Sequence, residues 1–457
     1  MCIRDRNVTQ VSVTNQKQKF ISMGWDVLEI DAQKEKEILD AVESAKSGTN
    51  KPTLIISKST IGKYAPNKEN TSGVHGSPLG ENEFELFLQN IGFSGDPFIH
   101  DSEIYSYFED KRANDNSKYD EWKANLESKL QSDKNFSQLW NQFNNFETRE
   151  VELEWSSDEA TRVVGGKILN QYGSSNKFII GGSADLAAST KQIISDNTFG
   201  SNNFGGNSIE FGIREHAMGG IVNGLALHSN LIPYGSTFLV FSDYMRPSMR
   251  LASLMNVNSL FIFTHDSIYL GEDGPTHQPI EHLMSLRLIP NLDVIRPSNS
   301  MELIHSYRYA LEKKDNPKAI ILSRQNMKFF DNDVSYKDFQ TGAYEFMPGK
   351  DITLVATGSE LELAFEISKN LKDLSVQIIS APILNKINKE KIESLNLNQN
   401  IFTLELGRSI GWDSYIENIT RSFSIDSFGE SAPIEELTER FSFSVKKISD
   451  EIRSLLN

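Results

Sequence analysis

The chain has 457 residues, which at roughly 150 residues per domain predicts three domains, each large enough to bury its own core. Its 62 acidic residues outnumber its 46 basic ones, and the formal charge of −16 disfavours binding of a nucleic acid through its phosphates. Hydrophobic residues make up 38% of the chain, yet no stretch approaches the roughly 18 apolar residues of a membrane span. We therefore expect a cytoplasmic protein with no nucleic-acid and no membrane partner.

Cys2 is the only cysteine, so the chain cannot form an internal disulfide, a cysteine-based zinc site or an iron–sulfur cluster. It lies in the leader 1–6, which is neither a signal peptide nor an amphipathic transit segment. This hexapeptide resembles translated sequencing adapter. We expect it to be non-native and the native start to lie upstream.

The first part of the chain predicts a short strand–helix–strand unit followed by a long loop. Apolar residues alternate over 25–30, recur at helical spacing over 34–46 and form a β-type run over 52–56. Residues 63–79 are rich in Gly, Asn, Pro and Ser, which predicts a functional loop. Residues 101–150 are charged and have no strand signal, so we expect a solvated helical connector.

From residue 157 onward, strands and helices are predicted to alternate, which is typical of a doubly wound parallel sheet. The expected strands are 177–180, 208–211, 259–264, 293–295 and 319–322, and the expected helices are 158–172, 215–228, 280–288 and 301–311. A third α/β unit is expected from residue 351, with strands 352–356, 376–379 and 401–405 and a helix at 360–370.

The residues that directly follow these strands are unusually polar. Ligands of open parallel sheets bind outside the carboxyl ends of the strands, so these positions are the informative ones. The segments are Gly-Gly-Ser-Ala-Asp at 181–185, Gly-Ile-Arg-Glu-His at 212–216, His-Asp-Ser at 265–267 and Ser-Arg-Gln-Asn at 323–326. Four such strand ends favour one convergent site over four separately decorated loops.

Each of these signals has a structural alternative when it is taken alone. Glu215 at a helix start is explained by the helix dipole, which gains roughly 0.3–1 kcal/mol from a carboxylate there. Phe238, Phe241 and Tyr244 lie at helical spacing, which more often indicates core than a cofactor stack. The segment 271–278 is compatible with an ordinary turn, and Gly181-Gly182 with a sharp one.

The combination of motifs, in this order, resembles transketolase from about Val13 to the C-terminus. The motifs are Phe-Gly-Ile-Arg-Glu-His-Ala-Met at 211–218, Thr-Phe-Leu-Val-Phe-Ser-Asp-Tyr at 237–244, Thr-His-Asp-Ser at 264–267, Gly-Glu-Asp-Gly-Pro-Thr-His-Gln at 271–278, Gly-Gly-Ser-Ala-Asp-Leu at 181–186, Ser-Arg-Gln-Asn at 323–326 and His-Gly-Ser-Pro-Leu-Gly at 75–80. The resemblance implies an α/β thiamine-diphosphate-binding fold with doubly wound parallel sheets and a C-terminal α/β domain.

The resemblance also implies an activity: transfer of a two-carbon ketol unit from a ketose phosphate to an aldose phosphate in the pentose phosphate pathway. Thiamine diphosphate would be the electron sink, and the protein would orient it and move protons. By similarity, Glu215 would hydrogen-bond the aminopyrimidine ring nitrogen of the cofactor. Phe238, Phe241 and Tyr244 would stack on that ring.

The remaining site residues follow from the same resemblance. His75 and His265 match histidines near the cofactor and the substrate, where they would exchange protons or stabilise negative charge, although each alone is equally compatible with a structural histidine. Further matches are Asp185 for a position near the cofactor, Asp273 and His277 for reading the sugar, and Arg162, Ser189 and Arg324 for holding its phosphate.

The family's signature for Mg²⁺, Gly-Asp-Gly with a later Asn, is not found in the sequence, and Gly-Glu-Asp-Gly at 271–274 belongs to the substrate motif instead. Two minor departures are Ala188, where the family often has Pro, and Tyr269, where it often has Gly. We therefore expect a C-terminal fragment that lacks most of the diphosphate-binding domain and with it all metal ligands. The expected divisions are 1–6 leader, 7–100 remnant of that domain, 101–155 helical linker, 156–332 pyrimidine-binding domain and 333–457 C-terminal domain.

The family implies a homodimer with active sites at the subunit interface. The closest alternatives are dihydroxyacetone synthase and 1-deoxyxylulose-5-phosphate synthase, and Arg324 and His75 favour transketolase over the second of these. A non-catalytic subunit or binding module, or one half of a split enzyme, are alternatives of a different class.

Overall fold

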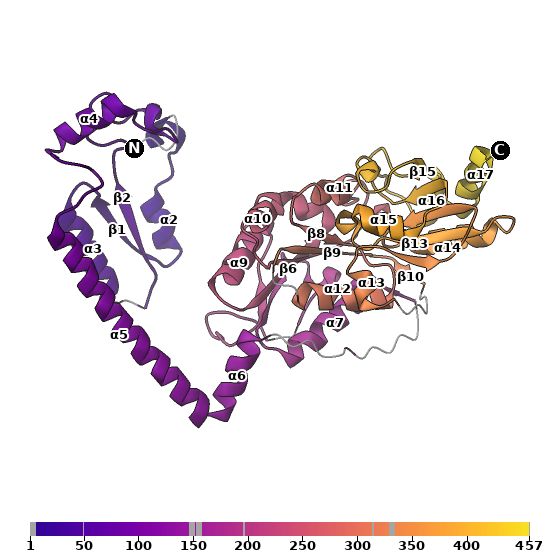
Figure 1. The fold of residues 1–457 in the computed structure, drawn as a ribbon, viewed down its shortest axis with the longest axis horizontal. Coiled ribbons are helices and arrows are strands. Elements are labelled where there is room, and N and C mark those ends of the chain that lie inside the picture. The colour runs from indigo at the N-terminus through magenta and orange to yellow at the C-terminus, as the bar shows by residue number, and fades with distance from the viewer. Residues whose placement is uncertain are drawn as a thin grey trace. The chain divides into compact units, whose positions relative to one another are not determined.

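The computed structural model describes residues 6–48, 50–145, 151, 158–194, 197–312, 315–328 and 334–456. Residues 1–5 of the expected leader, and Cys2 with them, lie outside this part of the chain. The chain divides into two compact units, Met1–Asn125 and Leu126–Asn457 (Figure 1).

The first unit contains the predicted strand–helix–strand arrangement. Strand β1 (Asp26–Asp31) pairs in parallel with β2 (Thr53–Lys58), and α3 (Glu35–Lys46) connects them. Two short helices, α1 (Val8–Val11) and α2 (Gln16–Ser22), precede β1. The sheet has two strands, and neither strand contains a buried residue.

The predicted loop after β2 is held by side chains of the first unit. It includes the 3-10 helix η1 (Ser72–Val74) and leads into α4 (Glu81–Asn90). Glu83 of α4 is buried, and its carboxylate accepts hydrogen bonds from the backbone and the side-chain nitrogens of Asn67 at 2.8 and 2.9 Å. The loop is therefore an ordered segment fixed against α4.

Helices occupy the segment that was predicted to be a charged helical connector. They are α5 (Ser102–Ser132) and α6 (Lys134–Asn144), and neither contains a buried residue. The predicted helical character is confirmed over these residues, whereas residues 146–150 lie outside the described chain. Among the described residues, no helix is long and apolar enough to cross a membrane.

The second unit begins with a six-stranded parallel sheet in the order β5-β4-β6-β7-β9-β8. Its strands are β4 (Ile179–Ser183), β5 (Ser208–Glu210), β6 (Ile232–Phe238), β7 (Leu260–Thr264), β8 (Asp293–Ile295) and β9 (Lys318–Leu322). A small antiparallel pair, β3 (Glu159–Ala160) with β10 (Asn326–Met327), lies outside it.

Helices cover both faces of this sheet, as predicted for a doubly wound fold (Figure 1). Ile262 of β7 belongs to the core shared with α7 (Thr161–Ser175) and α12 (Ser300–Glu312). Its neighbours Phe261 and Phe263 point into the opposite core, with α9 (Glu215–His228), α10 (Ser242–Leu254) and α11 (His282–Arg287). Alternate residues of a strand face opposite sides, so β7 is buried on both.

The central strand β6 was not predicted. All seven of its residues are buried, yet Pro233, Gly235, Ser236 and Thr237 give the segment no β-type apolar run. Pro233 is tolerated because it is near the start of the strand, where fewer ladder hydrogen bonds are lost. Past β6, the 3-10 helix η2 (Leu239–Phe241) leads into α10.

The C-terminal part forms a second, mainly parallel sheet in the order β11-β13-β12-β14-β15. The predicted strands are present as β12 (Ile352–Ala356), β13 (Val376–Ser380) and β14 (Asn400–Leu404). Two further strands, β11 (Tyr344–Met347) and β15 (Ile419–Phe423), were not predicted, and β11 runs antiparallel. The other elements of this part are α13 (Tyr336–Phe339), α14 (Glu360–Asn370), η4 (Leu384–Lys386), α15 (Lys389–Leu395), η5 (Trp412–Ser414), α16 (Ile434–Arg440) and α17 (Val445–Leu456).

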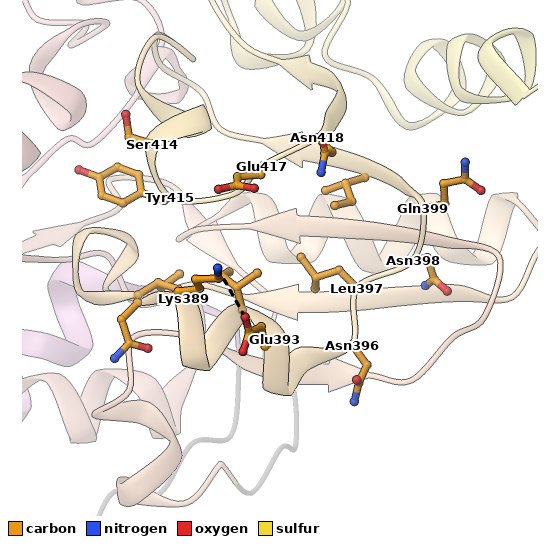
Figure 2. Close-up of a pocket in the computed structure, with 14 residues that line it drawn as sticks. Lys389, Glu393, Asn396, Leu397, Asn398, Gln399, Ser414, Tyr415, Glu417 and Asn418 are labelled. Atoms are coloured by element: carbon orange, nitrogen blue, oxygen red, sulfur yellow. Dashed lines mark ion pairs between the residues drawn. The ribbon is translucent and has the colours of Figure 1, made fainter.

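A cavity of about 910 Å³ lies in this second sheet's domain, beside α15 (Figure 2). Its lining includes the residues that lead into β14 and β15, so it opens at the amino ends of these strands. Ligands of parallel sheets bind at the opposite, carboxyl ends. None of the predicted site residues lines this cavity.

Candidate functional site

A second cavity, of about 610 Å³, lies at the carboxyl ends of β4 and β6 in the six-stranded sheet, where the switch-point rule places ligands. Six predicted site residues meet there. The residues that line it are Ala184, Asp185, Leu186, Ile213, Glu215, Phe238, Phe241, Tyr244 and His277.

Three aromatic rings form one wall of this cavity. The rings of Phe238 and Phe241 are stacked, with centroids 5.9 Å apart and planes 11° from parallel. The next pair, Phe241 and Tyr244, has centroids 6.2 Å apart at 27°. Tyr244 is 63% exposed, so the alternative that these rings only fill a core is wrong for this residue. A row of nearly parallel rings suits a flat heteroaromatic ligand.

Glu215 brings a carboxyl group into the same cavity. It is the first residue of α9 and is 9% exposed. Its place at a helix N-terminus is also favourable for a carboxylate, so the dipole explanation and a binding role are compatible. A buried carboxyl beside aromatic rings can share a proton with a weakly basic ring nitrogen.

His265 lies directly behind the aromatic wall. It follows β7 and is 4% exposed, and its ring stacks on Phe238 at a centroid distance of 3.7 Å. The hydroxyl of Thr264 lies 2.8 Å from its Nδ1. Burial first, and then the charges of Arg162 and Arg324, lower the pKa of His265 to about 3. His265 is therefore neutral at physiological pH and suits hydrogen bonding to a substrate rather than carrying a charge.

The other predicted sugar-reading residues lie on the segment 271–277. His277 lines the cavity, and its ring meets Phe241 edge-on at 5.6 Å. The hydroxyl of Thr276 is 2.9 Å from its Nδ1. Asp273 is exposed on the preceding turn and does not line the cavity.

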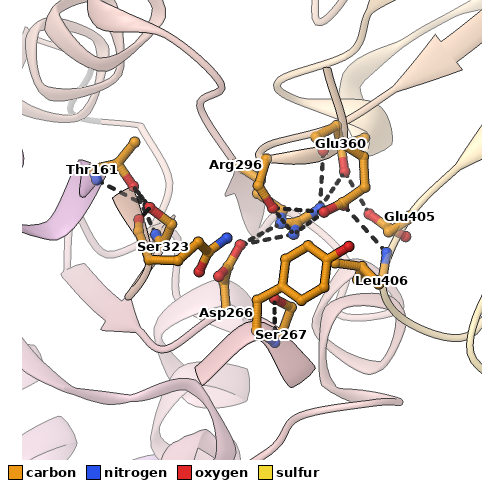
Figure 3. Close-up of polar contacts among 12 residues, drawn as sticks. Thr161, Asp266, Ser267, Arg296, Ser323, Glu360, Glu405 and Leu406 are labelled. Carbon is orange, nitrogen blue, oxygen red and sulfur yellow. Dashed lines mark hydrogen bonds and ion pairs between the residues drawn. The ribbon is translucent and has the colours of Figure 1, made fainter. Parts of the chain in front are cut away.

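Arg162 and Arg324 form a cationic pair next to this site. The residues before them, Thr161 and Ser323, are joined by a hydrogen bond from the Ser323 backbone nitrogen to Thr161 Oγ1 at 2.7 Å (Figure 3). Burial and the charge of Arg324 lower the pKa of Arg162. Two guanidinium groups held near one another indicate a site for an anion.

Ser189 contacts Arg162 in a different way from the one expected. Nη1 of Arg162 donates to the backbone carbonyl of Ser189 at 2.5 Å. The Nε of Arg162 is buried and has no hydrogen-bond partner among the described residues. The carbonyl of Ser189 thus orients the guanidinium through one of its five N–H donors.

The last two predicted site residues are His75 and Asp185, and both are exposed. His75 lies in the first unit, at the end of η1, and is exposed there. Asp185 lines the cavity but is itself exposed, and its backbone has a left-handed φ of 60°. A left-handed non-glycine residue two positions after the end of β4 turns the chain sharply at the edge of the cavity.

Sequence reasoning missed several residues that shape the site. Ala184, Leu186 and Ile213 line the cavity but carry no reactive group that a motif search would single out. A buried network of charges also includes Asp266, the residue after His265 in the sequence (Figure 3). Its members Arg296 and Glu405 directly follow β8 and β14, so the strand-end rule applied to every strand would have found them.

One group of three potential metal ligands is present among the described residues, namely Asp243, Glu281 and His282. Nε2 of His282 lies 3.2 Å from Asp243 Oδ2, which a hydrogen bond explains. None of the three lines the aromatic cavity.

Comparison with known proteins places the chain in a family. Profiles for the transketolase thiamine diphosphate binding domain, pyrimidine binding domain and TK C-terminal domain match residues 2–147, 158–329 and 342–444. A transketolase of Staphylococcus aureus is 36% identical over 479 residues, which cover 99% of this chain and 71% of that protein.

Solved structures agree with this assignment. Transketolase from Leishmania mexicana superposes with a TM-score of 0.91 at 29% identity, covering 98% of this chain and 69% of that one. A Pichia stipitis transketolase determined in complex with sedoheptulose 7-phosphate gives 0.90, also at 29% identity, with 99% and 70% coverage. The chain belongs to the transketolase family.

These matches correct one expectation. The thiamine diphosphate binding domain is present in the chain, so the expectation of a fragment lacking most of that domain is not borne out. That expectation depended on the missing motif Gly-Asp-Gly and on the interpretation of residues 13–95 as only the closing strands and helix of the domain. The prediction that the fold is an α/β fold with parallel sheets and a C-terminal α/β domain is confirmed.

The lowered pKa of His265 predicts a pH dependence of stability. Between the ordinary histidine value of 6.5 and about 3, the unfolded chain binds a proton that folded His265 does not, so stability falls as the pH drops through this range. Between pH 7 and pH 5 the loss from this residue should be about 2 kcal/mol.

The measurement is denaturant unfolding of the wild type and of His265→Gln at both pH values. The wild type should lose about 2 kcal/mol more than the variant over this interval. Equal losses in the two proteins would contradict the assignment of a neutral, buried His265.

Proposed function

We propose that the chain is the catalytic subunit of a transketolase, which transfers a two-carbon ketol unit between sugar phosphates with thiamine diphosphate as cofactor. The observation that carries the proposal is the cavity in which a row of aromatic rings faces the carboxyl group of Glu215. This combination fits the aminopyrimidine half of the cofactor, because the rings match its flat face and the carboxyl its ring nitrogen.

The residues present divide the work of binding and chemistry. When bound, thiamine diphosphate supplies an electron sink for chemistry next to a carbonyl group. Phe238, Phe241 and Tyr244 would hold the aminopyrimidine ring of the cofactor by stacking. Glu215 would hold a proton at the nitrogen of that ring. The neutral His265 behind Phe238 donates or accepts hydrogen bonds where charge develops on the substrate oxygen.

We assign the sugar phosphate to His277, which lines the cavity, and to the two arginines, whose charges act on His265. Arg162 and Arg324 bind the phosphate through charge-assisted hydrogen bonds, which guanidinium groups form with two phosphate oxygens at once. His277 and Asp273 read hydroxyl groups of the sugar, and Ser189 orients Arg162 through its carbonyl. By the family resemblance, His75 is proposed as a further residue that acts at the cofactor.

Mg²⁺ is proposed as the partner of the cofactor's diphosphate. Among the described residues, the cavity lining offers two carboxylates, Asp185 and Glu215, and no group of three metal ligands. No residue of this chain is therefore assigned to the metal. We further propose that the enzyme acts in the pentose phosphate pathway in the cytoplasm.

A homodimer is the proposed assembly. The helices α9 and α10 contact one another, and several apolar side chains on or next to them are exposed. With their exposed fractions they are Ile213 (78%), Ile221 (47%), Leu227 (59%), Tyr244 (63%), Leu251 (49%) and Leu254 (68%). We propose that they form one association surface. An apolar patch of this kind marks an association surface. Ile213 and Tyr244 also line the aromatic cavity, so a second copy bound here would border the active site.

Glu215 provides the first test. Glu215→Gln keeps the size of the side chain but cannot share a proton in the same way, so transfer from xylulose 5-phosphate to ribose 5-phosphate should fall by about 10²–10⁴-fold. The assay is formation of sedoheptulose 7-phosphate with thiamine diphosphate and Mg²⁺. The matched control is Glu281→Gln, an exposed glutamate outside the cavity lining, which should retain activity.

Three results would each redirect the proposal. An active Glu215→Gln would remove this residue from the chemistry. A wild type that binds the cofactor but makes no sedoheptulose 7-phosphate would favour dihydroxyacetone synthase or 1-deoxyxylulose-5-phosphate synthase activity. A wild type that binds no cofactor would support a non-catalytic protein.

Arg324 tests the phosphate assignment. Arg324→Ala removes a charge-assisted hydrogen bond of about 1.5–3 kcal/mol, which corresponds to a rise in the KM for ribose 5-phosphate of roughly 10- to 100-fold. The control is Arg421→Ala, an exposed arginine on β15 that pairs with Glu451. An unphosphorylated aldose acceptor should react equally with the wild type and Arg324→Ala, and a comparable loss with that acceptor would contradict the assignment.

The association surface is tested by charge insertion. Leu254→Asp places a carboxylate on the association surface, so a dimer of this 51.5-kDa chain should dissociate to monomers in sedimentation velocity. Leu455→Asp, at an exposed leucine of α17 (47%), is the matched control and should remain dimeric. A Leu254→Asp protein that still sediments as a dimer would exclude this face as the interface.

A further inference from the structure

We infer that Arg296 is a positioning residue for His265: through Asp266, the C-terminal domain holds the turn that places this histidine behind the aromatic wall. The inference depends on the proposed function for the role of His265 in catalysis. The positioning of His265 depends on geometry alone, so it can be tested without an activity assay.

The turn after β7 must be stabilised by contacts with residues outside the turn. His265 has a left-handed backbone with φ of 61°, which is unfavourable for a residue with a side chain. The next residue, Asp266, is 2% exposed. Because these two residues are adjacent, a shift of the backbone at Asp266 also displaces the backbone of His265, whose ring is stacked on Phe238.

Arg296 supplies these contacts. Its Nη2 and Nε donate to Oδ2 of Asp266 at 2.7 and 3.1 Å (Figure 3). The other carboxylate oxygen, Oδ1, is buried and has no hydrogen-bond partner among the described residues. The side chain of Asp266 is therefore anchored through a single oxygen by a single guanidinium.

The same guanidinium is fixed from the C-terminal domain. Nη1 of Arg296 donates to the carbonyl and the hydroxyl oxygens of Thr357 at 3.0 Å each, and it also contacts Oε2 of Glu360. Thr357 follows β12 and Glu360 is the first residue of α14. Gly358 between them has φ of +54°, and a Cβ there would lie 2.6 Å from Nε of Arg296. The backbone of this loop is thus shaped around the arginine.

Charges around Arg296 keep it ionised despite its complete burial. Burial by itself opposes the charge, but Glu360 and Asp266 raise the pKa of Arg296 above its usual value. The neighbouring Glu405 is bound at both carboxylate oxygens by Arg287, and these contacts outweigh burial and lower the pKa of Glu405 to about 2. Arg287 does not contact Asp266, which makes it a matched control for Arg296.

The experiment compares Arg296→Lys with Arg287→Lys in the full chain. Each replaces a buried guanidinium that forms two hydrogen bonds to a carboxylate by a single ammonium, which cannot reproduce them. A general loss of stability is expected in both. A displaced His265 is expected for Arg296→Lys alone.

The first measurement does not depend on activity. His265 is 4% exposed, so the wild type should react slowly with diethyl pyrocarbonate at this residue, as followed by peptide mass spectrometry. Arg296→Lys should increase the rate at His265 at least tenfold, and Arg287→Lys should leave it within about twofold. Equal rates in the two variants would overturn the inference.

The second measurement is steady-state kinetics. Arg296→Lys should lower kcat by about 10- to 100-fold with KM for both sugar phosphates within about threefold, because misplacement of a reacting group affects the chemical step. In the pH profile of kcat, the acid limb of Arg296→Lys should shift to higher pH, since an exposed His265 regains a more ordinary pKa. Arg287→Lys should keep both its kcat and its pH profile.

Asp266→Asn provides a second test if Arg296→Lys folds poorly. Asp266→Asn has the same shape and retains an oxygen toward Arg296 but loses the charge, so a smaller increase in His265 reactivity and a smaller loss of kcat are expected. An unchanged reaction rate at His265 in this variant would also contradict the inference. A wild type without transketolase activity would overturn the proposed function and leave the reactivity test of positioning intact.

Discussion

The buried guanidinium of Arg296 is the interaction on which the arrangement of the pyrimidine-binding and C-terminal sheets depends. It follows β8 of one sheet and contacts Thr357 and Glu360, which follow β12 of the other. Loss of one partner from a buried ion pair costs about 3–5 kcal/mol, because the remaining charge stays buried. The carboxyl ends of the C-terminal strands, where a ligand of an open parallel sheet would bind, are therefore occupied by a side chain of the same protein. The corresponding edge of the pyrimidine-binding sheet stays open and forms the aromatic cavity.

The fold was predictable from the sequence where a buried strand consists of a continuous run of apolar residues. Strand β7, Leu-Phe-Ile-Phe-Thr, is buried on both faces, and its sequence indicates this directly. The central strand β6 is equally buried but contains Pro233, Gly235 and Ser236, which have low strand propensity. Its position is set by the strands on either side, and that information is not local to the segment. The same limitation applies to the edge strand β11, which follows no regular apolar pattern.

The site was partly predictable, because the strand-end rule and the resemblance to the family each identified different residues. Glu215 and His265 follow strands and carry reactive groups, so their position and their chemistry both indicated site residues. The stacked rings at Phe238, Phe241 and Tyr244 span a strand, a 3-10 helix and an α-helix, so their helical spacing described the geometry incorrectly. The neutral state of His265 was not predictable, since its pKa depends on burial and on two arginines that are distant in sequence.

The central claim is that the aromatic cavity binds the aminopyrimidine ring of thiamine diphosphate with Glu215 at the ring nitrogen. The most direct measurement is a crystal structure of the protein with thiamine diphosphate and Mg²⁺. The account predicts the ring between Phe238, Phe241 and Tyr244, with a Glu215 carboxylate oxygen within hydrogen-bond distance of its nitrogen. Cofactor density elsewhere, with this cavity holding only solvent, would contradict the account.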